Sequence, residues 1–336
     1  MRKITYLIIT IIFISCAENQ VKKNLADESS SITEGFWERI GTIQIVNGVE
    51  VDTIFFKDVE GDEKPRQIKA YVKGHFAWLN NREIGQRIKD DYKEINEFPW
   101  ISGSGGFGNY SFSDKGEINM RENMTNIIGS VVGWNSPFRD NVRNNGVNNL
   151  TFTSNVNGNN YTQLMRLEEE VNETDNWQSG IEYAEYYKKL DETNPTKIDG
   201  VWKHIANVKY INGVAVDTIG VPDGLDDHKM FLKGNVIVNF DFTKAKAGDP
   251  NWGGAGLAGT FTYKDNLLVE KFNLSTGNWR AAGGEWPPTP YDIEWIDDDS
   301  FVQIWKFVAR QGENGELEFV ENESNETNGL LHVRVK

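Results

Sequence analysis

The residues Gly35-Phe-Trp-Glu-Arg-Ile-Gly-Thr-Ile-Gln-Ile-Val-Asn-Gly-Val-Glu-Val-Asp-Thr-Ile54 have a counterpart at Gly200-Val-Trp-Lys-His-Ile-Ala-Asn-Val-Lys-Tyr-Ile-Asn-Gly-Val-Ala-Val-Asp-Thr-Ile219. Ten of the twenty positions are identical at a constant offset of 165 residues. Three further pairs of segments match in the same order along the chain. Residues 69–76 match 229–236, residues 108–112 match 259–263, and residues 161–167 match 301–307. A period of this length is far above that of solenoid repeats, so the chain contains one domain twice.

Each copy has the period of β-strands. Apolar or aromatic residues alternate with polar ones, as in half-buried strands, and pairs such as Asn212-Gly213 and Lys233-Gly234 are typical of tight hairpin turns. We expect about eight to ten strands in each copy and no full-length amphipathic helix. The segment 183–190 also fits a helix, but we assign it to a strand because its counterpart, 330–335, alternates. Many short antiparallel strands predict an all-β barrel or sandwich.

The start of the chain predicts export. Met1-Arg2-Lys3 precedes an apolar run, 4–14, and a small residue, Ser15, stands before Cys16. This is the pattern of a secretory signal, and the run is too short to span a bilayer. The expected organisation is a signal peptide with the lipidation cysteine (1–16), a flexible polar tether (17–33), a first domain (34–192), a linker (193–199) and a second domain (200–336).

Phe13-Ile14-Ser15-Cys16 resembles a lipobox, the processing site of bacterial lipoproteins. The resemblance implies that Cys16 is acylated and becomes the new N-terminus, which would give a durable membrane anchor. Ala17 follows the cysteine in place of the aspartate that retains many lipoproteins on the inner membrane, so the expected location is the cell envelope at the outer membrane. The alternative is a cleaved signal of a soluble exported protein with an incidental cysteine.

The charge of the chain excludes one class of partner. The formal net charge is −15, and loss of Arg2 and Lys3 with the signal makes the mature chain more acidic still. Such a chain is repelled by nucleic acid. Cys16 is the only cysteine, so no intramolecular disulfide is available. Stability must therefore come from the core, for which the chain has 11 Trp, 11 Tyr and 18 Phe.

The opening Gly35-x-Trp37 and Gly200-x-Trp202, followed by eight or more strands, resemble the start of a lipocalin-like (calycin) barrel. More narrowly, the order of motifs is similar to lipocalin-like domains common in secreted proteins of the Bacteroidota. Lys229-Met-Phe231, Gly259-Thr-Phe261 and Gln303-Ile-Trp305 carry this similarity. The resemblance implies two tandem antiparallel lipocalin-like β-barrels, each with its tryptophan plugging the closed end, and a small apolar ligand within a barrel.

Two glycine-rich segments, Gly103–Gly108 and Gly254–Gly259, fit the Gly-x-Gly-x-x-Gly pattern. A dinucleotide site needs this pattern between a strand and a helix. Both segments continue into alternating, strand-like residues instead. We therefore expect the glycines to allow bends or bulges in a strand, and we expect no cofactor.

The candidates for ligand contacts are Phe76, Trp78, His204, Arg166, Lys306 and Trp305, and the candidates for structural roles are Trp37, Trp202, Gly35 and Gly200. Phe76 and Trp78 share one face of a strand, while His75 lies on the other. We expect His75 to be a surface or hydrogen-bonded histidine, and the alternative is a catalytic or ligand role. His204 aligns with Arg39 near the barrel end. Arg166 and Lys306 align with each other as cations of the interior or closed end. In lipocalins a late-strand arginine packs on the first-strand tryptophan, and the alternative role is anion binding.

Other chemistry finds little support in the residues. Four scattered histidines and one cysteine do not give the spacings of a zinc site, and the acidic runs 223–227 and 297–299 fit solvated turns better than a calcium loop. Three hypotheses remain for function. The first is a membrane-anchored protein that binds a small apolar or amphipathic ligand, the second is an assembly lipoprotein that binds an envelope protein through barrel surfaces, and the third is an enzyme at a barrel mouth.

Overall fold

The computed structural model describes residues 34–47, 49–58, 66–80, 104–112, 117–127, 148–166, 181–241, 254–276, 287–311 and 317–336. The predicted signal peptide, Cys16 and the tether lie outside these ranges. The described part is all-β, as predicted, apart from one 3-10 turn, η1 (Phe56–Asp58). None of its helices has the length and apolarity needed to cross a membrane.

The first sheet has nine strands, all antiparallel to their neighbours. They are β1 (Gly35–Val46), β2 (Val49–Phe55), β3 (Gln67–Val72), β4 (His75–Asn80), β5 (Ser104–Phe112), β6 (Glu117–Ile127), β7 (Asn148–Asn157), β8 (Asn160–Arg166) and β9 (Ile181–Lys189). Their order is β2-β1-β3-β4-β5-β6-β7-β8-β9, and β1 also pairs with β9. The eight strands other than β2 therefore form a closed antiparallel barrel, and β2 is an extra strand on β1.

The second sheet also has nine strands. They are β10 (Gly200–Ile211), β11 (Val214–Gly220), β12 (Asp226–Leu232), β13 (Asn235–Asp241), β14 (Gly254–Lys264), β15 (Leu267–Thr276), β16 (Thr289–Asp297), β17 (Ser300–Ile304) and β20 (Glu326–Arg334). The order, β11-β10-β12-β13-β14-β15-β16-β17-β20, repeats that of the first sheet, and β10 also pairs with β20. A separate two-stranded sheet contains β18 (Phe307–Gln311) and β19 (Leu317–Glu321).

The turns and bulges arise where the sequence provides suitable residues. Lys73-Gly74 and Lys233-Gly234 both have positive φ angles, with values of 48° and 79° in the first turn and 45° and 88° in the second. Two consecutive positive φ angles make the tight turn that matches the twist of a hairpin. The segment 181–189 is a strand, as predicted from its counterpart.

The glycine-rich segments are strands with bulges, as expected. The pairing register shifts between Phe107 and Gly108 on β5 and between Ala258 and Gly259 on β14. At Gly259 an added Cβ would collide with the backbone of Lys271 on the neighbouring strand. A glycine is therefore needed at this bulge because the two backbones approach closely.

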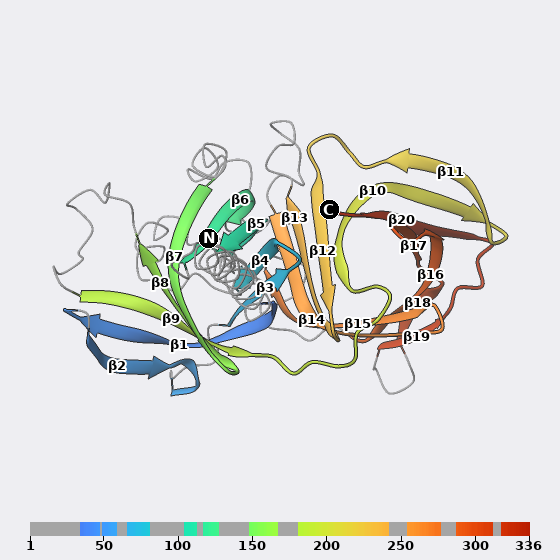
Figure 1. Ribbon diagram of the computed structural model, residues 1–336. Helices are drawn as coiled ribbons and strands as arrows, with labels where there is room; N and C mark the ends of the chain where they lie inside the picture. The colour runs from blue at the N-terminus through green and yellow to red at the C-terminus, as the bar shows by residue number, and fades with distance from the viewer. Residues whose placement is uncertain are drawn as a thin grey trace, which may run out of the picture.

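The outer faces of the two sheets pack against each other (Figure 1). β3, β4 and β5 contact β12, β13 and β14 at the centre of the molecule. One buried apolar cluster includes residues from both halves, which are Phe36, Ile68, Ala70, Val72, Ala77, Leu79 and Phe107 from the first, and Val201, Met230, Ile237, Ala258 and Leu274 from the second. The strands at this junction are consequently buried on both faces. All six residues of β3 are buried.

Candidate functional site

Each sheet buries the tryptophan of its first strand. Trp37 on β1 and Trp202 on β10 are both 0% exposed. The Trp37 ring centre lies 5.6 Å from that of Tyr161, and the Trp202 ring centre lies 4.7 Å from that of Phe301. The Trp202 indole also donates a hydrogen bond of 2.8 Å to the carbonyl of Ile198. Both tryptophans are thus packed on the inner face, among aromatic side chains.

A cation lies against each of these tryptophans. It comes from the last strand of the sheet, β9 or β20, which pairs with the first strand. The Lys189 ammonium lies 5.9 Å from the Trp37 ring centre, and the Arg334 guanidinium carbon lies 4.1 Å from that of Trp202. The pairing of β1 with β9 and of β10 with β20 sets these cations opposite the tryptophans. The expected cation–π contact on the first-strand tryptophan is therefore present. Its cations are Lys189 and Arg334, whereas the sequence suggested the aligned pair Arg166 and Lys306.

Lys306 does not point to the interior. It follows the end of β17, and its side chain is 48% exposed and ion-paired with Asp292. The side chain of Arg166, its aligned partner, lies outside the described residues. The sequence expectation failed for Lys306 because a strand that ends at Ile304 no longer fixes the direction of the residues that follow.

Gly35 and Gly200 leave room for the packed cations. Their φ angles are 142° and 149°, in a region that side-chain-bearing residues rarely adopt. A Cβ at Gly35 would meet the Lys189 side chain, and a Cβ at Gly200 would meet that of Arg334. The Gly-x-Trp motif therefore combines a buried tryptophan with the space for a cation beside it.

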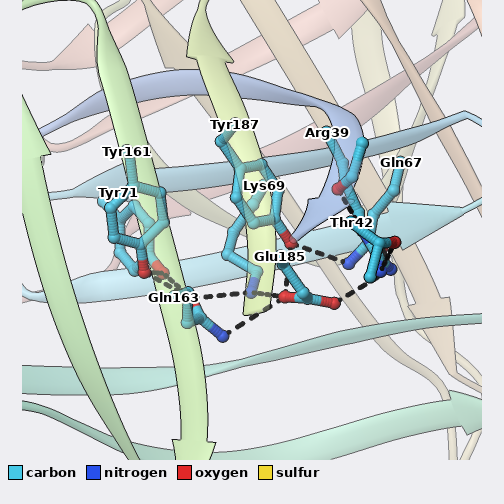
Figure 2. A network of polar contacts seen from close by, with 10 residues as sticks. Arg39, Thr42, Gln67, Lys69, Tyr71, Tyr161, Gln163, Glu185 and Tyr187 are labelled. Atoms are coloured by element: carbon cyan, nitrogen blue, oxygen red, sulfur yellow. Dashed lines mark hydrogen bonds and ion pairs between the residues drawn. The ribbon is translucent and has the colours of Figure 1, made fainter. Parts of the chain in front are cut away.

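A lysine lies at the centre of a polar network inside the first barrel (Figure 2). The Lys69 side chain on β3 is 4% exposed. Its ammonium donates to the side-chain oxygen of Gln163 at 3.1 Å and lies 3.4 Å from the Glu185 carboxylate. The other Glu185 oxygen forms an ion pair of 3.1 Å with Arg39. One carboxylate thus pairs with two cations.

Tyrosines complete this network. The Tyr187 hydroxyl donates to Glu185 at 2.7 Å and accepts a bond of 3.1 Å from the Gln67 amide. The Tyr71 and Tyr161 hydroxyls lie 3.2 Å apart, and both donate toward the Gln163 oxygen. Every residue of the network has a partner within it (Figure 2).

The environment raises the pKa of the buried tyrosines and lowers that of Glu185. Burial raises the pKa of Tyr161 and Tyr187 well above the ordinary value. Burial also acts to raise the pKa of Glu185, but the charges of Lys69 and Arg39 and the hydrogen bond from Tyr187 outweigh it, so the pKa is lowered. At neutral pH the tyrosines are therefore neutral donors, and Glu185 is the anion that holds the two cations.

The second sheet has a related group at equivalent positions. Lys229 on β12 corresponds to Lys69, and its ammonium donates to Glu270 at 2.9 Å and to Gln303 at 3.0 Å. Gln303 corresponds in turn to Gln163. The Lys229 and Glu270 side chains are 7% and 1% exposed, so the charges are deeply buried as a pair.

The carboxylates, in contrast, come from different strands. Glu185 belongs to β9, the last strand of the first sheet, whereas Glu270 belongs to β15, in the middle of the second. The two sheets share the lysine and the amide, but the carboxylate that pairs with the lysine comes from a different strand in each. Because an unpaired buried charge is strongly unfavourable, each lysine needs such a partner.

His204 and His332 lie side by side on the inner face of the second sheet. They are paired across β10 and β20, and their ring centres are 5.6 Å apart. His204 Nδ1 lies 3.2 Å from the Asp227 carboxylate, and its Nε2 lies 3.0 Å from the carbonyl of Ala206. Both ring nitrogens of His204 therefore face oxygen acceptors, one on a side chain and one on the backbone.

The remaining candidates lie as follows. Phe76 is buried in the cluster around Trp37, and Trp78 packs against the same cluster, so the two share the inner face. Trp305 packs against the aromatic cluster of the second sheet, with its ring centre 6.0 Å from that of Tyr291. His75 lies on the opposite face, buried between the sheets, and bonds to the Asn109 amide at 3.0 Å.

The buried lysines were not among the residues predicted from the sequence, although the sequence contains a signal for them. Lys69 and Lys229 each stand two residues before an aromatic residue that is buried on the inner face, in segments that match between the copies. A charged residue kept in phase with core residues predicts a buried cation. Glu185 and Glu270 gave no such signal, because they are not aligned with each other. Within the described residues, no group of three or more metal-ligating side chains occurs.

Comparison with known proteins gives only distant likeness. No family model and no curated protein matches the chain. Among solved structures, it is similar to the uncharacterized protein YLR301w from Saccharomyces cerevisiae, with a TM-score of 0.35, 10% identity, and coverage of 90% of this chain and 98% of that one. It is also similar to a protein of unknown function from the DUF3598 family of Nostoc punctiforme, with a TM-score of 0.21, 10% identity, and coverage of 92% and 98%. Likeness at this level carries no argument about function.

Proposed function

We propose that the chain is an exported, lipid-anchored binding protein with two tandem lipocalin-like barrels, at least one of which holds a small apolar or amphipathic ligand. The equal strand order of the two sheets, with β1 paired to β9 and β10 to β20, supports the tandem architecture. The buried Trp37 and Trp202, each under a cation, support the lipocalin-like type.

The observation that carries the binding role is the composition of the inner faces. Each combines aromatic side chains with a deeply buried lysine, Lys69 or Lys229, at the same position of the duplicated domain. Ligand sites are mostly apolar, with a few well-placed polar groups that fix orientation. Burial of apolar ligand surface would supply affinity at about 25 cal/mol per Å².

Native mass spectrometry tests this proposal. The purified unacylated protein is incubated with an extracted metabolite pool and analysed under conditions that keep complexes intact. We expect one small molecule to remain bound at a fixed stoichiometry. If no molecule is retained from a broad set of extracts, the binding role is wrong.

The lipid anchor at Cys16 is tested separately. Cells that produce the full chain are labelled with an alkyne fatty acid, and the membranes are then fractionated. We expect label on the wild-type chain in the outer-membrane fraction and none on a Cys16→Ala variant. Label on both proteins would rule out Cys16 as the attachment site.

One observation favours a second function, the binding of an envelope protein through the barrel surfaces. Val49, Val51 and Ile54 on β2 are 63%, 55% and 50% exposed, and the equivalent Val214, Val216 and Ile219 on β11 are 64%, 52% and 60% exposed. Exposed apolar groups at equivalent places in both copies are typical of interaction sites. Crosslinking in cells should then yield a protein adduct that is lost when these six residues are changed to threonine.

A further inference from the structure

The second barrel contains buried polar atoms that the protein itself leaves without hydrogen-bond partners. His332 is 1% exposed, and neither of its ring nitrogens has a partner among the residues that the structure describes. The same holds for one carboxylate oxygen of Asp227 and for the hydroxyl of Ser275. Buried polar groups are normally satisfied, and each exception needs an explanation.

These atoms face the interior of the second barrel. Phe301, which belongs to the inner aromatic cluster, is the cross-strand neighbour of His332, and their ring centres are 5.0 Å apart. Ser275 is paired with Leu257 of the same cluster. Asp227 shares its face of β12 with Lys229, because residues two apart on a strand point the same way.

The first barrel fills the equivalent position differently. Tyr187 pairs with Arg39 as His332 pairs with His204, so the two residues correspond in the duplicated domain. The Tyr187 hydroxyl has two partners, Glu185 at 2.7 Å and Gln67 at 3.1 Å. At this position the first barrel provides hydrogen-bond partners for its polar side chain, Tyr187. The second barrel provides none for His332 among the described residues.

The buried cation of the second barrel already has its counter-ion. The Lys229 ammonium lies 2.9 Å from the Glu270 carboxylate, and both side chains are deeply buried. A charged ligand would add an uncompensated charge to a buried space, which is strongly unfavourable. An uncharged ligand is therefore favoured.

His332 then defines the polar group of that ligand. Burial, with the nearby charges of Lys229 and His204, lowers its pKa well below the ordinary value, so the ring is neutral at pH 7. A neutral imidazole has one N–H donor and one bare acceptor nitrogen. A hydroxyl group both donates and accepts, so it can bond to either ring nitrogen of His332, and its type also suits the unpartnered oxygens of Asp227 and Ser275.

We propose that the second barrel, and not the first, binds an uncharged molecule with an apolar body and a hydroxyl group, which hydrogen-bonds to His332. This inference rests on the proposed binding function and specifies its site and ligand class. The ring of Phe301, which lies next to His332, and the ring of Trp202, which packs on Phe301, would cover the apolar body.

Three probes of equal chain length test the ligand class by isothermal titration calorimetry at pH 7 on the purified unacylated protein. They are 1-decanol, 1-methoxydecane, which accepts but does not donate a hydrogen bond, and decanoate, which is charged. We expect 1-decanol to bind with one site per chain. The other two should bind at least about tenfold more weakly, since each hydrogen bond that is lost or charge that is buried weakens binding.

Variants at the two equivalent positions test the site. His332→Leu should weaken 1-decanol binding at least about tenfold while the melting temperature stays the same or rises, because an unsatisfied buried polar group is removed. His332→Phe serves as a second variant of different shape. Tyr187→Phe, the matched control, should lower the melting temperature, because it breaks satisfied hydrogen bonds, and leave 1-decanol affinity unchanged.

The outcomes separate the two proposals. Binding of none of the three probes would count against the binding function as a whole. Binding that persists in both His332 variants, or that Tyr187→Phe abolishes, would place the ligand elsewhere and overturn this inference alone. Tighter binding of decanoate than of 1-decanol would overturn the uncharged ligand class.

Discussion

Two lysines, Lys69 and Lys229, show how single residues determine the interior of this protein. Each is buried with a glutamine from the equivalent position of its domain, and each finds a carboxylate from a different strand. The two sheets therefore have the same buried cation and different counter-ions. A buried lysine is tolerated only when a carboxylate lies beside it. If the carboxylate on one strand is lost, another strand must therefore provide one.

Removal of the Lys229 charge should be costly, whereas removal of the whole pair should not. Lys229→Met leaves Glu270, which is 1% exposed, without its cation, and we expect a loss of roughly 3–5 kcal/mol in the free energy of unfolding. The double variant Lys229→Met with Glu270→Leu should recover most of this loss. Urea unfolding followed by circular dichroism measures both. A double variant as unstable as the single one would show that the ion pair itself provides net stability.

At the scale of elements, the two sheets share their bulges. The register shifts at equivalent glycines on β5 and β14, and at Gly259 on β14 the neighbouring backbone approaches closely. These strands also contact each other at the junction of the two sheets. The bulge is thus a feature of the duplicated domain at the place where the copies meet, and it explains a glycine pattern that otherwise suggests a nucleotide site.

Gly259→Ala should destabilise the protein by about 1–3 kcal/mol. The added methyl group would overlap the backbone of Lys271 on β15, and overpacked positions lose stability of this order. Thr260→Ala, at the adjacent exposed residue, is the control and should change stability by less than about 0.5 kcal/mol. Thermal unfolding distinguishes the two. Equal melting temperatures would mean that β14 shifts to admit the methyl group.

At the scale of the whole molecule, the junction between the sheets joins two β-sheets into one structure. Leu79 of the first half and Ile237 of the second are 0% and 1% exposed in the shared cluster. Gly256 of β14 lies so close to Leu79 that a Cβ would collide with it. His228 stacks on Phe107 across the junction, with ring centres 3.9 Å apart, and Asn239 donates to the carbonyl of Gly106 at 2.9 Å.

This junction should make the two halves unfold together. Differential scanning calorimetry of the wild type should give one transition, because an apolar interface couples the sheets. Ile237→Asp places a charge in the junction, and two separated transitions are expected. Ile296→Asp, at a position 59% exposed on β16, makes the same chemical change at the surface and should keep the single transition. One unaltered transition for Ile237→Asp would argue against coupling.

Stability should fall as the solution becomes acidic. Burial, with smaller opposing and reinforcing charge effects, lowers the pKa of His228 to about 4. The folded state then binds fewer protons than the unfolded state, whose histidines have a pKa of about 6.5. The stability from neutral His228 is complete above about pH 6.5 and is lost progressively as the pH falls toward 4, by on the order of 2–3 kcal/mol.

Urea unfolding at pH 7, 6, 5 and 4.5 measures this dependence. His228→Gln should unfold with a shallower pH dependence over the same range, because the side chain that must gain a proton is absent. His75 and His332, whose pKa values burial also lowers, remain in the variant and set the residual slope. Identical slopes for the two proteins would show that His228 does not take up a proton on unfolding.

The sequence by itself determined the duplication, the β-strands, the hairpin turns and the glycine bulges. These features depend on side-chain period and local backbone geometry, which neighbouring residues specify. Only the tertiary structure decided which cation packs on Trp202, which carboxylate neutralises each buried lysine, and why His75 and His228 are buried. These contacts join strands far apart in the chain, and a strand pattern states which face a side chain lies on but not which strand or sheet lies opposite.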